Sequence, residues 1–306
     1  MNKHNQLHIR TESGFALMVV IGAVAVVGVI SLALWQFRQH QATLTSAAGT
    51  SSTTTPTPPA VTPSPTPKPA DSADTMANPA KVTSADGKTY FVYGAPAGQN
   101  NAAPKKIIVS LPGHGTSADD GYKAWKTSLT GTGYALAEFN WWKGTGEKTT
   151  DYYSPAEVVK EARAFLNQQG YSASDRVISH GFSRGSANTY AVIAQDKTLA
   201  GSVFDAVISN AGKYQSDFPL GISDASDTNI TRLYKNMPWV LVCGGLDPNP
   251  TRDGCPGMAE TAAWLSGHGA NVLTTLTDAN QGHGAFHMSS KGLPKQALSL
   301  IDAALK

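Results

Sequence analysis

The pattern of apolar and polar positions divides the chain into three parts. Residues 14–36 are uncharged and almost wholly apolar, residues 37–79 are rich in Ser, Thr and Pro, and residues 80–306 alternate short apolar runs with amphipathic segments. A helix needs about 20 apolar residues to cross a bilayer, whereas the apolar region of a cleavable signal peptide is normally shorter. The pattern predicts a transmembrane anchor at 14–36, preceded by a short cytoplasmic tail at 1–13.

The flanks of this anchor predict where the rest of the chain lies. Lys3 and Arg10 precede the apolar run, which favours a cytoplasmic amino terminus. Residues 37–79 have little to bury, and repeated prolines keep such a segment extended and solvated. We expect a disordered stalk that holds residues 80–306 outside the cytoplasm, as the extracytoplasmic domain of a membrane-anchored protein.

Within residues 80–306, strand-like and helix-like patterns alternate. The uninterrupted apolar run at 107–109 is typical of a strand buried on both faces of a parallel sheet. Asp86-Gly87 indicates a hairpin turn, and Ser154-Pro155-Ala156-Glu157 indicates a helix start with a capping box. The expected strands are 81–83, 88–93, 106–111, 134–139, 176–179, 204–209, 239–243 and 271–277. The expected helices are 155–170, 186–195, 258–265 and 295–305. This alternation predicts an α/β fold, with a mostly parallel central sheet and helices on both of its faces.

The net charge and the spacing of the histidines limit the partners and cofactors that we expect this protein to bind. The net charge is only +2 and no Lys/Arg cluster is dense, so we expect no nucleic-acid partner. The histidines lack the H-E-x-x-H spacing of zinc enzymes. The segment from Asp247 to Gly254 resembles a calcium loop, but its Gly comes too late and Met258 stands where the closing Glu belongs. We expect neither a metal nor another cofactor.

One motif indicates nucleophilic chemistry. Gly181-Phe182-Ser183-Arg184-Gly185 fits the pattern G-x-S-x-G, with an apolar strand before it and a helix-like segment after it. A sharp strand-to-helix turn needs Gly on each side of the Ser, and it exposes the hydroxyl at the amino end of the helix. The segment resembles the nucleophile elbow of the α/β-hydrolase family, with Ser183 as nucleophile. The alternative is a structural turn with an idle serine.

The resemblance extends to the loop after the first long strand. Leu111-Pro112-Gly113-His114-Gly115-Thr116 lies where this family places a backbone donor of the oxyanion hole. The resemblance implies that the amides of Thr116 and Arg184 face the developing oxyanion. The family's fuller run of glycines is missing here, and His114 is interpreted as a residue that holds the loop.

The same resemblance implies an acid and a base. In this family the acid follows a late strand and the histidine follows the last strand, which corresponds to Asp247 and His283. Such an acid fixes the tautomer of the imidazole, which takes the proton of the serine. Asp253 shares the loop of Asp247, and His287 follows His283, so both stay open as alternatives.

Three further features bear on the site. Cys243 and Cys255 bracket the Asp247 loop, where they would form a disulfide outside the cytoplasm or else remain free thiols. Residues 213–236 are long enough to form a small cap over the site. Four aromatic residues line a substrate pocket or simply pack beneath a loop: Trp141, Trp142, Tyr152 and Tyr153.

Together these features predict a serine hydrolase that cleaves a small or polymeric carboxylic ester through an acyl-enzyme. The resemblance covers residues 81–306 and is nearest to secreted esterases and polyester depolymerases. Two alternatives stay open. One is a peptidase or acyltransferase with the same triad, and the other is an inactive cell-surface binding module on the same scaffold.

Overall fold

The computed structural model describes residues 76–97, 105–144, 146, 148–199, 201–214 and 234–306. The expected anchor at 14–36, most of the expected stalk and positions 215–233 of the expected cap lie outside these residues. Within the described part of the chain, no helix is both long and apolar enough to cross a bilayer.

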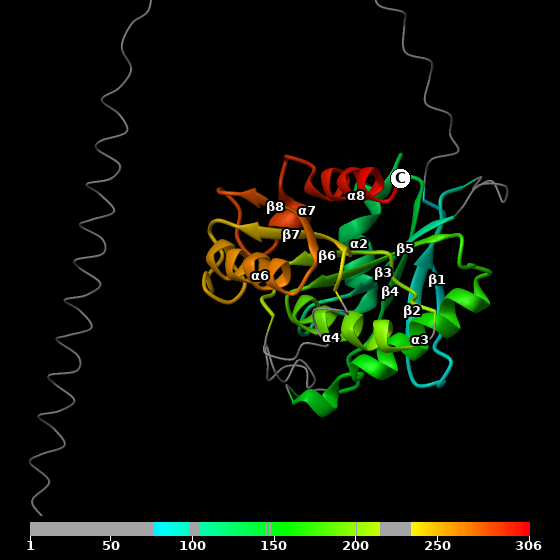
Figure 1. Cartoon of the computed structure of the whole chain (residues 1–306). Helices are drawn as coiled ribbons and strands as arrows, with labels where there is room; N and C mark the ends of the chain where they lie inside the picture. The colour runs from blue at the N-terminus through cyan, green and yellow to red at the C-terminus, as the bar shows by residue number, and fades with distance from the viewer. Residues whose placement is uncertain (1–75, 98–104, 145, 147, 200, 215–233) are drawn as a thin grey trace, which may run out of the picture. The chain divides into compact units, whose positions relative to one another are not determined.

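The described residues build one eight-stranded sheet with helices packed against it (Figure 1). The strands are β1 (Ala80–Thr83), β2 (Tyr90–Gly94), β3 (Lys106–Leu111), β4 (Tyr134–Phe139), β5 (Arg176–Phe182), β6 (Ala206–Asn210), β7 (Pro238–Gly244) and β8 (Asn271–Asp278). The helices are α2 (Ala118–Leu129), α3 (Pro155–Gln168), α4 (Arg184–Thr198), α6 (Cys255–Gly267), α7 (Ala285–Met288) and α8 (Leu293–Ala304), with a 3-10 turn η2 (Thr149–Asp151). The sheet order is β1-β2-β4-β3-β5-β6-β7-β8. Strands β3 to β8 are parallel, and β1 and β2 are antiparallel to their neighbours, so the predicted mostly parallel sheet is confirmed.

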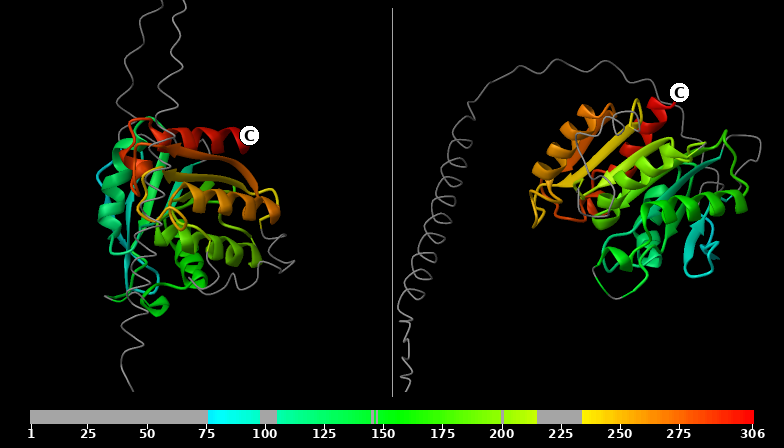
Figure 2. Two further views of the ribbon diagram at one scale, coloured as in Figure 1. Left: turned by 90° about the vertical axis from the view of Figure 1, so that its left-hand side faces the viewer. Right: turned by 60° about the horizontal axis from the view of Figure 1, so that its bottom comes forward.

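Helices cover both faces of this sheet, because its central strands are apolar on both sides. In β3, Ile107 and Val109 pack into one core with α3, α4 and α6, whereas Ile108 packs into a second core with α2, α7 and α8. Figure 2 shows the two helical layers on opposite sides of the strands. The predicted arrangement of helices on both faces is confirmed.

The order of the strands reverses at β3. Helix α2 carries the chain from β3 to β4 on one side, and α3 then carries it back to β5 on the other side of β3. Leu111 at the end of β3 is paired with Gly181 near the end of β5. The chain leaves β3 toward β4 and leaves β5 toward β6, in opposite directions, and ligands of open α/β sheets bind at the carboxyl ends of two such strands.

Two local signals in the sequence are confirmed. The segment around Asp86-Gly87 joins β1 to β2 as an antiparallel hairpin, with Gly87 at a φ of 71°. Ser154 and Glu157 form the predicted capping box at the start of α3.

Helix α2 was not predicted. Its apolar positions Ala118, Tyr122, Trp125 and Leu129 have helical spacing, and Ser117 caps its first turn. Gly121 and the polar residues between these positions weaken the pattern, so the interval looks like a loop in the sequence.

The structure also places Met76 against the sheet domain. Met76, assigned from sequence to the stalk, forms a β-bridge with Pro96 and packs into the core that contains α2. Its apolar side chain is buried there.

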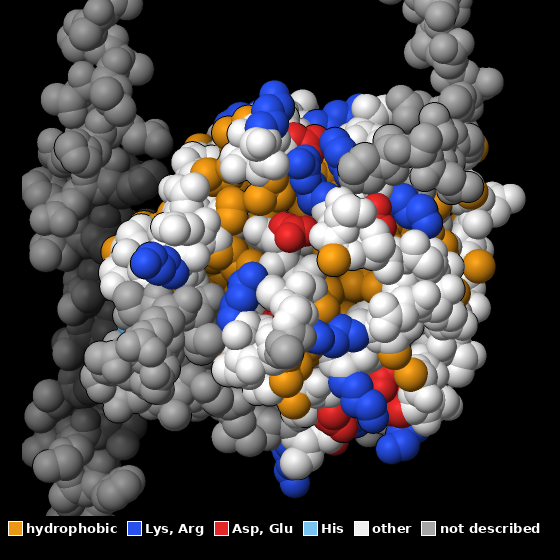
Figure 3. Space-filling model, turned by 45° about the vertical axis from the view of Figure 1, so that its right-hand side comes forward, with side chains coloured by type: hydrophobic (Ala, Val, Ile, Leu, Met, Phe, Trp, Pro, Cys, Tyr) orange, Lys and Arg blue, Asp and Glu red, His pale blue; other side chains and the backbone are white. Residues whose placement is uncertain are grey.

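Charges of both signs lie on the surface. On the face in Figure 3, Lys and Arg side chains lie among acidic and uncharged groups, with hydrophobic atoms between them. Several cations are paired, as Lys81 is with Asp119 at 3.0 Å and Lys143 is with Glu157 at 2.9 Å. The charge pattern on this face is therefore mixed.

Candidate active site

Ser183 is the single residue between the end of a strand and the start of a helix. β5 ends at Phe182 and α4 begins at Arg184. The φ of Ser183 is 53° and its ψ is −116°, a conformation that costs a non-glycine residue on the order of 1–3 kcal/mol. Its N–H donates to the Asn210 carbonyl at 2.8 Å and its carbonyl accepts from the Ala187 N–H at 3.0 Å. These bonds hold Ser183 in a sharp strand-to-helix turn of the predicted kind.

Glycines make this turn sterically feasible. A Cβ atom at Gly181 would overlap the Gly185 carbonyl, and a Cβ atom at Gly185 would overlap the carbonyl of Leu111 in β3. A Cβ atom at Gly212, in the loop after β6, would overlap the carbonyl of Ser183 itself. Backbone segments therefore approach the turn too closely for any side chain at these positions.

The loop after β3 reaches Ser183 through Gly113, where a Cβ atom would lie 3.2 Å from the Ser183 Cβ. The N–H of Thr116 donates to the Gly113 carbonyl at 3.2 Å, and Gly115 between them has a φ of 67°. This amide closes a tight turn within the loop. Arg184 is the first residue of α4, where backbone N–H groups are not used by the hydrogen bonds of the helix itself.

Two of the four aromatic residues brace this loop. The indole N–H of Trp141 donates to the Pro112 carbonyl at 2.9 Å. The hydroxyl of Tyr152 lies 2.6 Å from His114 Nδ1 and accepts from the Arg184 guanidinium at 3.2 Å. Trp141 and Tyr152 are both buried. His114 therefore has the loop-holding contact that the sequence suggested.

The other two aromatic residues make contacts away from Ser183. The buried Tyr153 donates its hydroxyl proton to Asp86 at 2.9 Å, and Trp142 donates its indole N–H to the Gly146 carbonyl at 3.2 Å. For Tyr153, these contacts agree with the expectation that it packs beneath a loop rather than lines a substrate pocket.

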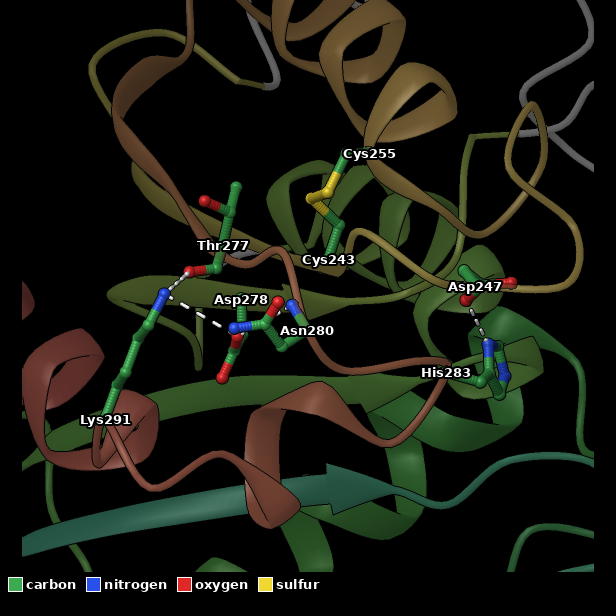
Figure 4. The surroundings of a disulfide bond; sticks show 8 residues. All are labelled: Cys243, Asp247, Cys255, Thr277, Asp278, Asn280, His283 and Lys291. Atoms are coloured by element: carbon green, nitrogen blue, oxygen red, sulfur yellow. Dashed lines mark hydrogen bonds and ion pairs between the residues drawn. A yellow bond between two sulfur atoms is a disulfide. The ribbon is translucent and has the colours of Figure 1, made fainter. Parts of the chain in front are cut away.

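Asp247 and His283 come together from two loops at the carboxyl edge of the sheet. Asp247 Oδ2 lies 2.7 Å from His283 Nδ1, and the two side chains point toward one another in Figure 4. Asp247 is buried, and its other oxygen accepts the Asn249 N–H at 2.8 Å. A carboxylate at Nδ1 favours the tautomer in which Nδ1 carries the proton and Nε2 is the basic atom. The pair is therefore arranged to accept a proton at Nε2 of His283.

His283 also packs beside the turn that carries Ser183. The rings of His283 and Phe182 have centroids 5.0 Å apart, and Phe182 immediately precedes Ser183. The imidazole is only partly buried, with 31% of its side chain exposed. The structure thus brings Ser183, His283 and Asp247 into one region, although they are distant in the sequence.

The two alternative residues have other partners. Asp253 accepts two hydrogen bonds from the Arg252 guanidinium, at 2.8 and 2.6 Å. His287 lies in α7 with its ring 5.0 Å from that of Trp125, and burial lowers its pKa to about 4. Of the two histidines, His283 is the one that an acid orients.

Three acidic and imidazole side chains of this region lie close enough together to resemble a metal site. Ligand atoms of Asp247, Asp253 and His283 lie within 4.8 Å of one another. His283 Nδ1 is already bonded to Asp247, and the Arg252 guanidinium is bonded to Asp253. A guanidinium beside the cluster opposes a divalent cation, so this arrangement fits an ion-pair network better than a metal site.

A disulfide bond closes the loop that carries Asp247. Cys243 in β7 and Cys255 at the start of α6 are bonded, with Cα atoms 5.0 Å apart and a sequence separation of 12 (Figure 4). The alternative of two free thiols is therefore wrong in this structure. The bond ties the two ends of the acid loop to one another.

Sequence reasoning missed a row of polar residues inside the sheet. Glu138 in β4, Ser110 in β3 and His180 in β5 are paired across the strands, and all three are buried. Burial raises the pKa of Glu138 to about 8 and lowers the pKa of His180 well below its ordinary value. A single Glu within the otherwise apolar run 134–139 was the available signal.

Comparison with known proteins identifies the fold. No protein-family model and no curated protein matches the chain. An esterase of Pyrococcus furiosus is 16% identical, with a TM-score of 0.51, over 80% of this chain and 98% of its own. A dienelactone hydrolase, so described, of Klebsiella pneumoniae is 14% identical, with a TM-score of 0.54, over 74% of this chain and 98% of its own. A CIB-like hydrolase, so described, of Thermoplasma acidophilum is 13% identical, with a TM-score of 0.52, over 74% of this chain and 99% of its own.

These identities are too low to transfer an activity. The agreement in architecture nevertheless extends over 74–80% of this chain and over nearly all of each of the three solved structures. The mostly parallel sheet, its two helical layers and the strand-to-helix turn at Ser183 point to the same class. The chain has the α/β-hydrolase fold.

Proposed function

We propose that this protein is a serine hydrolase that cleaves carboxylic esters, with Ser183 as nucleophile, His283 as base and Asp247 as the residue that orients the base. The observation that carries the proposal is the buried Asp247 carboxylate, 2.7 Å from His283 Nδ1, beside a serine held at positive φ. A strained serine and an oriented imidazole in one region are typical of functional sites.

In the proposed reaction, Ser183 Oγ attacks the carbonyl carbon of the ester while His283 Nε2 takes the hydroxyl proton. The tetrahedral intermediate collapses, and the alcohol leaves with the proton that His283 held. Water then attacks the acyl-enzyme by the same route, so that an acid is released and Ser183 regains its proton. The Asp247 carboxylate stabilises the imidazolium in both halves of the reaction.

The developing oxyanion needs two donors close to Ser183. Arg184 supplies one backbone N–H, because it begins α4 directly after the serine. Thr116 is engaged with Gly113, so we assign the second donor to the segment between them, at Gly113 to Gly115. The contact of Gly113 with Ser183 supports this assignment.

Reaction with a fluorophosphonate probe tests the class of enzyme. We expect the wild-type protein and a Ser266→Ala variant, altered at an exposed serine on α6, to be labelled. The Ser183→Ala variant should not be labelled. Equal labelling of all three proteins would show that Ser183 is not the activated nucleophile. Labelling of none of them would show the same and would favour a binding module.

Assays with esters and with matched amides then separate an esterase from a peptidase or acyltransferase. We expect release of acid from the ester and little turnover of the amide. Transfer of the acyl group to an added alcohol in preference to water would instead identify an acyltransferase.

We also propose that residues 14–36 anchor the domain in a membrane, with residues 80–306 on the extracytoplasmic side. The length and apolar character of the segment support an anchor, and Lys3 and Arg10 support the orientation. The disulfide at Cys243 and Cys255 is consistent with an oxidising compartment.

A further inference from the structure

The hydroxyl of Tyr152 contacts both segments that are assigned to the oxyanion, although Tyr152 belongs to neither. Tyr152 follows η2 directly, and it is buried. Its oxygen lies 2.6 Å from Nδ1 of His114, in the loop after β3. The same oxygen lies 3.2 Å from the guanidinium of Arg184, the first residue of α4. One phenolic oxygen therefore links the loop after β3 to the start of α4.

The direction of these hydrogen bonds follows from the chemistry of the partners. A guanidinium carries only donors, so the Tyr152 oxygen accepts the hydrogen bond from Arg184. The single phenolic proton is then available for His114 Nδ1, which accepts it when the other ring nitrogen of the neutral imidazole carries the proton. The charged guanidinium polarises the hydroxyl and strengthens the bond that it donates. The hydrogen bonds thus run from Arg184 through Tyr152 to His114.

The loop that contains His114 needs contacts of this kind to hold its shape. His114 stands between Gly113 and Gly115, and Gly115 has a φ of 67°. Glycine restricts its own backbone less than any other residue, so the local sequence does not fix the amides of this segment. His114 is exposed, so burial of its side chain does not fix them either. Tertiary contacts such as the bond to Tyr152 must therefore hold the segment in place.

Tyr152 is itself held firmly by its neighbours. The centroid of its ring lies 4.5 Å from that of Trp141, whose indole N–H donates to the Pro112 carbonyl at 2.9 Å in the same loop. Its backbone forms a β-bridge with Trp142. Tyr152 and Trp141 are both buried. The hydroxyl therefore has a fixed position before any substrate binds, and stabilisation of an oxyanion depends on donors that are fixed in advance.

We propose that Tyr152 is a positioning residue, which acts through His114 to hold the backbone donors at Gly113 to Gly115 in place for the oxyanion. The proposal rests on the proposed ester hydrolysis at Ser183. Tyr152 takes no part in proton transfer with Ser183. An oxyanion develops only as the reaction proceeds, so a displaced donor lowers kcat and leaves binding of the ground-state ester largely unchanged. Loss of the Tyr152 hydroxyl should therefore slow the chemical step.

The test compares Tyr152→Phe with Tyr153→Phe, because each removes one hydroxyl from a buried tyrosine and leaves its ring in place. The hydroxyl of Tyr153 donates to Asp86, so this variant controls for the loss of a hydrogen bond away from Ser183. Outright loss of one oxyanion donor lowers kcat by about 10²- to 10³-fold, so a displaced donor should lower it by about 10- to 100-fold. We expect that loss in Tyr152→Phe, with KM within about threefold of the wild-type value. The kcat of Tyr153→Phe should stay within about threefold of wild type.

A transition-state analogue gives a readout that a merely structural role would not move. Ser183 Oγ adds to the carbonyl carbon of a trifluoromethyl ketone while its proton passes to His283, and the carbonyl oxygen becomes an oxyanion. The inhibition constant of this ketone should rise in Tyr152→Phe by about the same factor by which kcat/KM falls. His114→Ala should also lower kcat, and the double variant should be no worse than the more impaired single variant, because both changes break one hydrogen bond.

A loss of kcat in Tyr152→Phe smaller than about tenfold would overturn the inference, as would an equal loss in Tyr153→Phe or a loss confined to KM. Losses that multiply in the double variant would show that Tyr152 does not act through His114. If Tyr152→Phe does not fold, His114→Ala decides the question, because His114 is exposed, and an unchanged kcat in that variant would count against the inference. Fluorophosphonate labelling of the wild-type protein separates the outcomes. A labelled Ser183 together with a fully active Tyr152→Phe variant would retain the proposed function and remove only this inference.

Discussion

Asp247 and His283 are 36 positions apart in the sequence, yet Asp247 Oδ2 lies 2.7 Å from His283 Nδ1. Asp247 follows β7 and His283 follows β8, and these two strands are adjacent and parallel. Their carboxyl ends therefore meet at one edge of the sheet, where both loops face the end of β5. Replacement of Asp247 therefore tests directly whether this contact matters for catalysis.

Replacement of Asp247 by Asn should lower kcat for ester hydrolysis by about 10³- to 10⁴-fold, because the amide no longer favours the productive tautomer of His283. The matched variant is Asp253→Asn, which should keep kcat within about tenfold since Asp253 is bonded to Arg252. Steady-state kinetics on a p-nitrophenyl ester would measure both. A larger loss in Asp253→Asn than in Asp247→Asn would reverse the assignment.

The stability of the domain should fall with rising pH because of Glu138. Its pKa is raised by burial from an ordinary 4.5 to about 8, so the folded state binds one more proton than the unfolded chain between these values. That contribution is fully present below pH 4.5 and is lost as pH rises through 8, by at most about 1.4 kcal/mol per pH unit.

The Glu138→Gln variant cannot lose this proton. Its free energy of unfolding, relative to wild type, should therefore rise by up to about 4 kcal/mol from pH 5 to pH 8. His287, whose pKa is lowered to about 4, contributes with the opposite sign, but it is common to both proteins and cancels in the difference. Urea titrations at several pH values give this difference, and a pH-independent result would mean that Glu138 is ionised in the folded state.

Loss of the disulfide should destabilise the domain and disturb the acid loop. Closing the 12-position loop between Cys243 and Cys255 contributes about 3 kcal/mol in the chain-entropy model. We expect a reducing agent to lower the denaturation midpoint and kcat of the wild-type protein. A Cys243→Ala/Cys255→Ala variant is the control, because it should be insensitive to the reducing agent. An unchanged wild-type midpoint would show that the bond adds no stability.

Two glycine substitutions should differ sharply. A Cβ atom at Gly185 would overlap the Leu111 carbonyl, whereas one at Gly267 in α6 meets nothing within 4 Å. Gly185→Ala should lower the free energy of unfolding by several kcal/mol, as other substitutions that overpack a core do, or it should prevent folding. Gly267→Ala should raise the free energy of unfolding by up to about 1 kcal/mol. Thermal unfolding measures both, and a well-folded Gly185→Ala protein would contradict the close approach of β3 to the turn.

The segment at 14–36 should decide where the protein is found in the cell. We expect the full chain to sediment with membranes and to require detergent for release, whereas a variant without residues 1–36 should remain in the supernatant. Fractionation by ultracentrifugation distinguishes the two. Recovery of the full chain in the supernatant would contradict the anchor.

The elements with strong apolar patterns were predictable because burial on both faces of a sheet demands uninterrupted apolar runs. β3 and β7 are examples, and Ser154 and Glu157 marked the start of α3 through local hydrogen bonds alone. Helix α2 could not be predicted because it is stabilised by the packing of Tyr122 and Trp125 rather than by local helix propensity. Gly121 weakens its pattern, yet it is the residue that makes room for Glu138.

The sequence by itself determined the alternation of strands and helices, the glycines around Ser183 and the order in which serine, aspartate and histidine follow one another. These features are encoded locally, by periodicity and by the conformations that each residue allows. Only the tertiary structure decided that Asp247 rather than Asp253 contacts His283, that the Thr116 amide is engaged in its own turn, and that Glu138 meets His180 across β3. Contacts of this kind depend on strand order and register, because residues far apart along the chain become neighbours only when the sheet has formed.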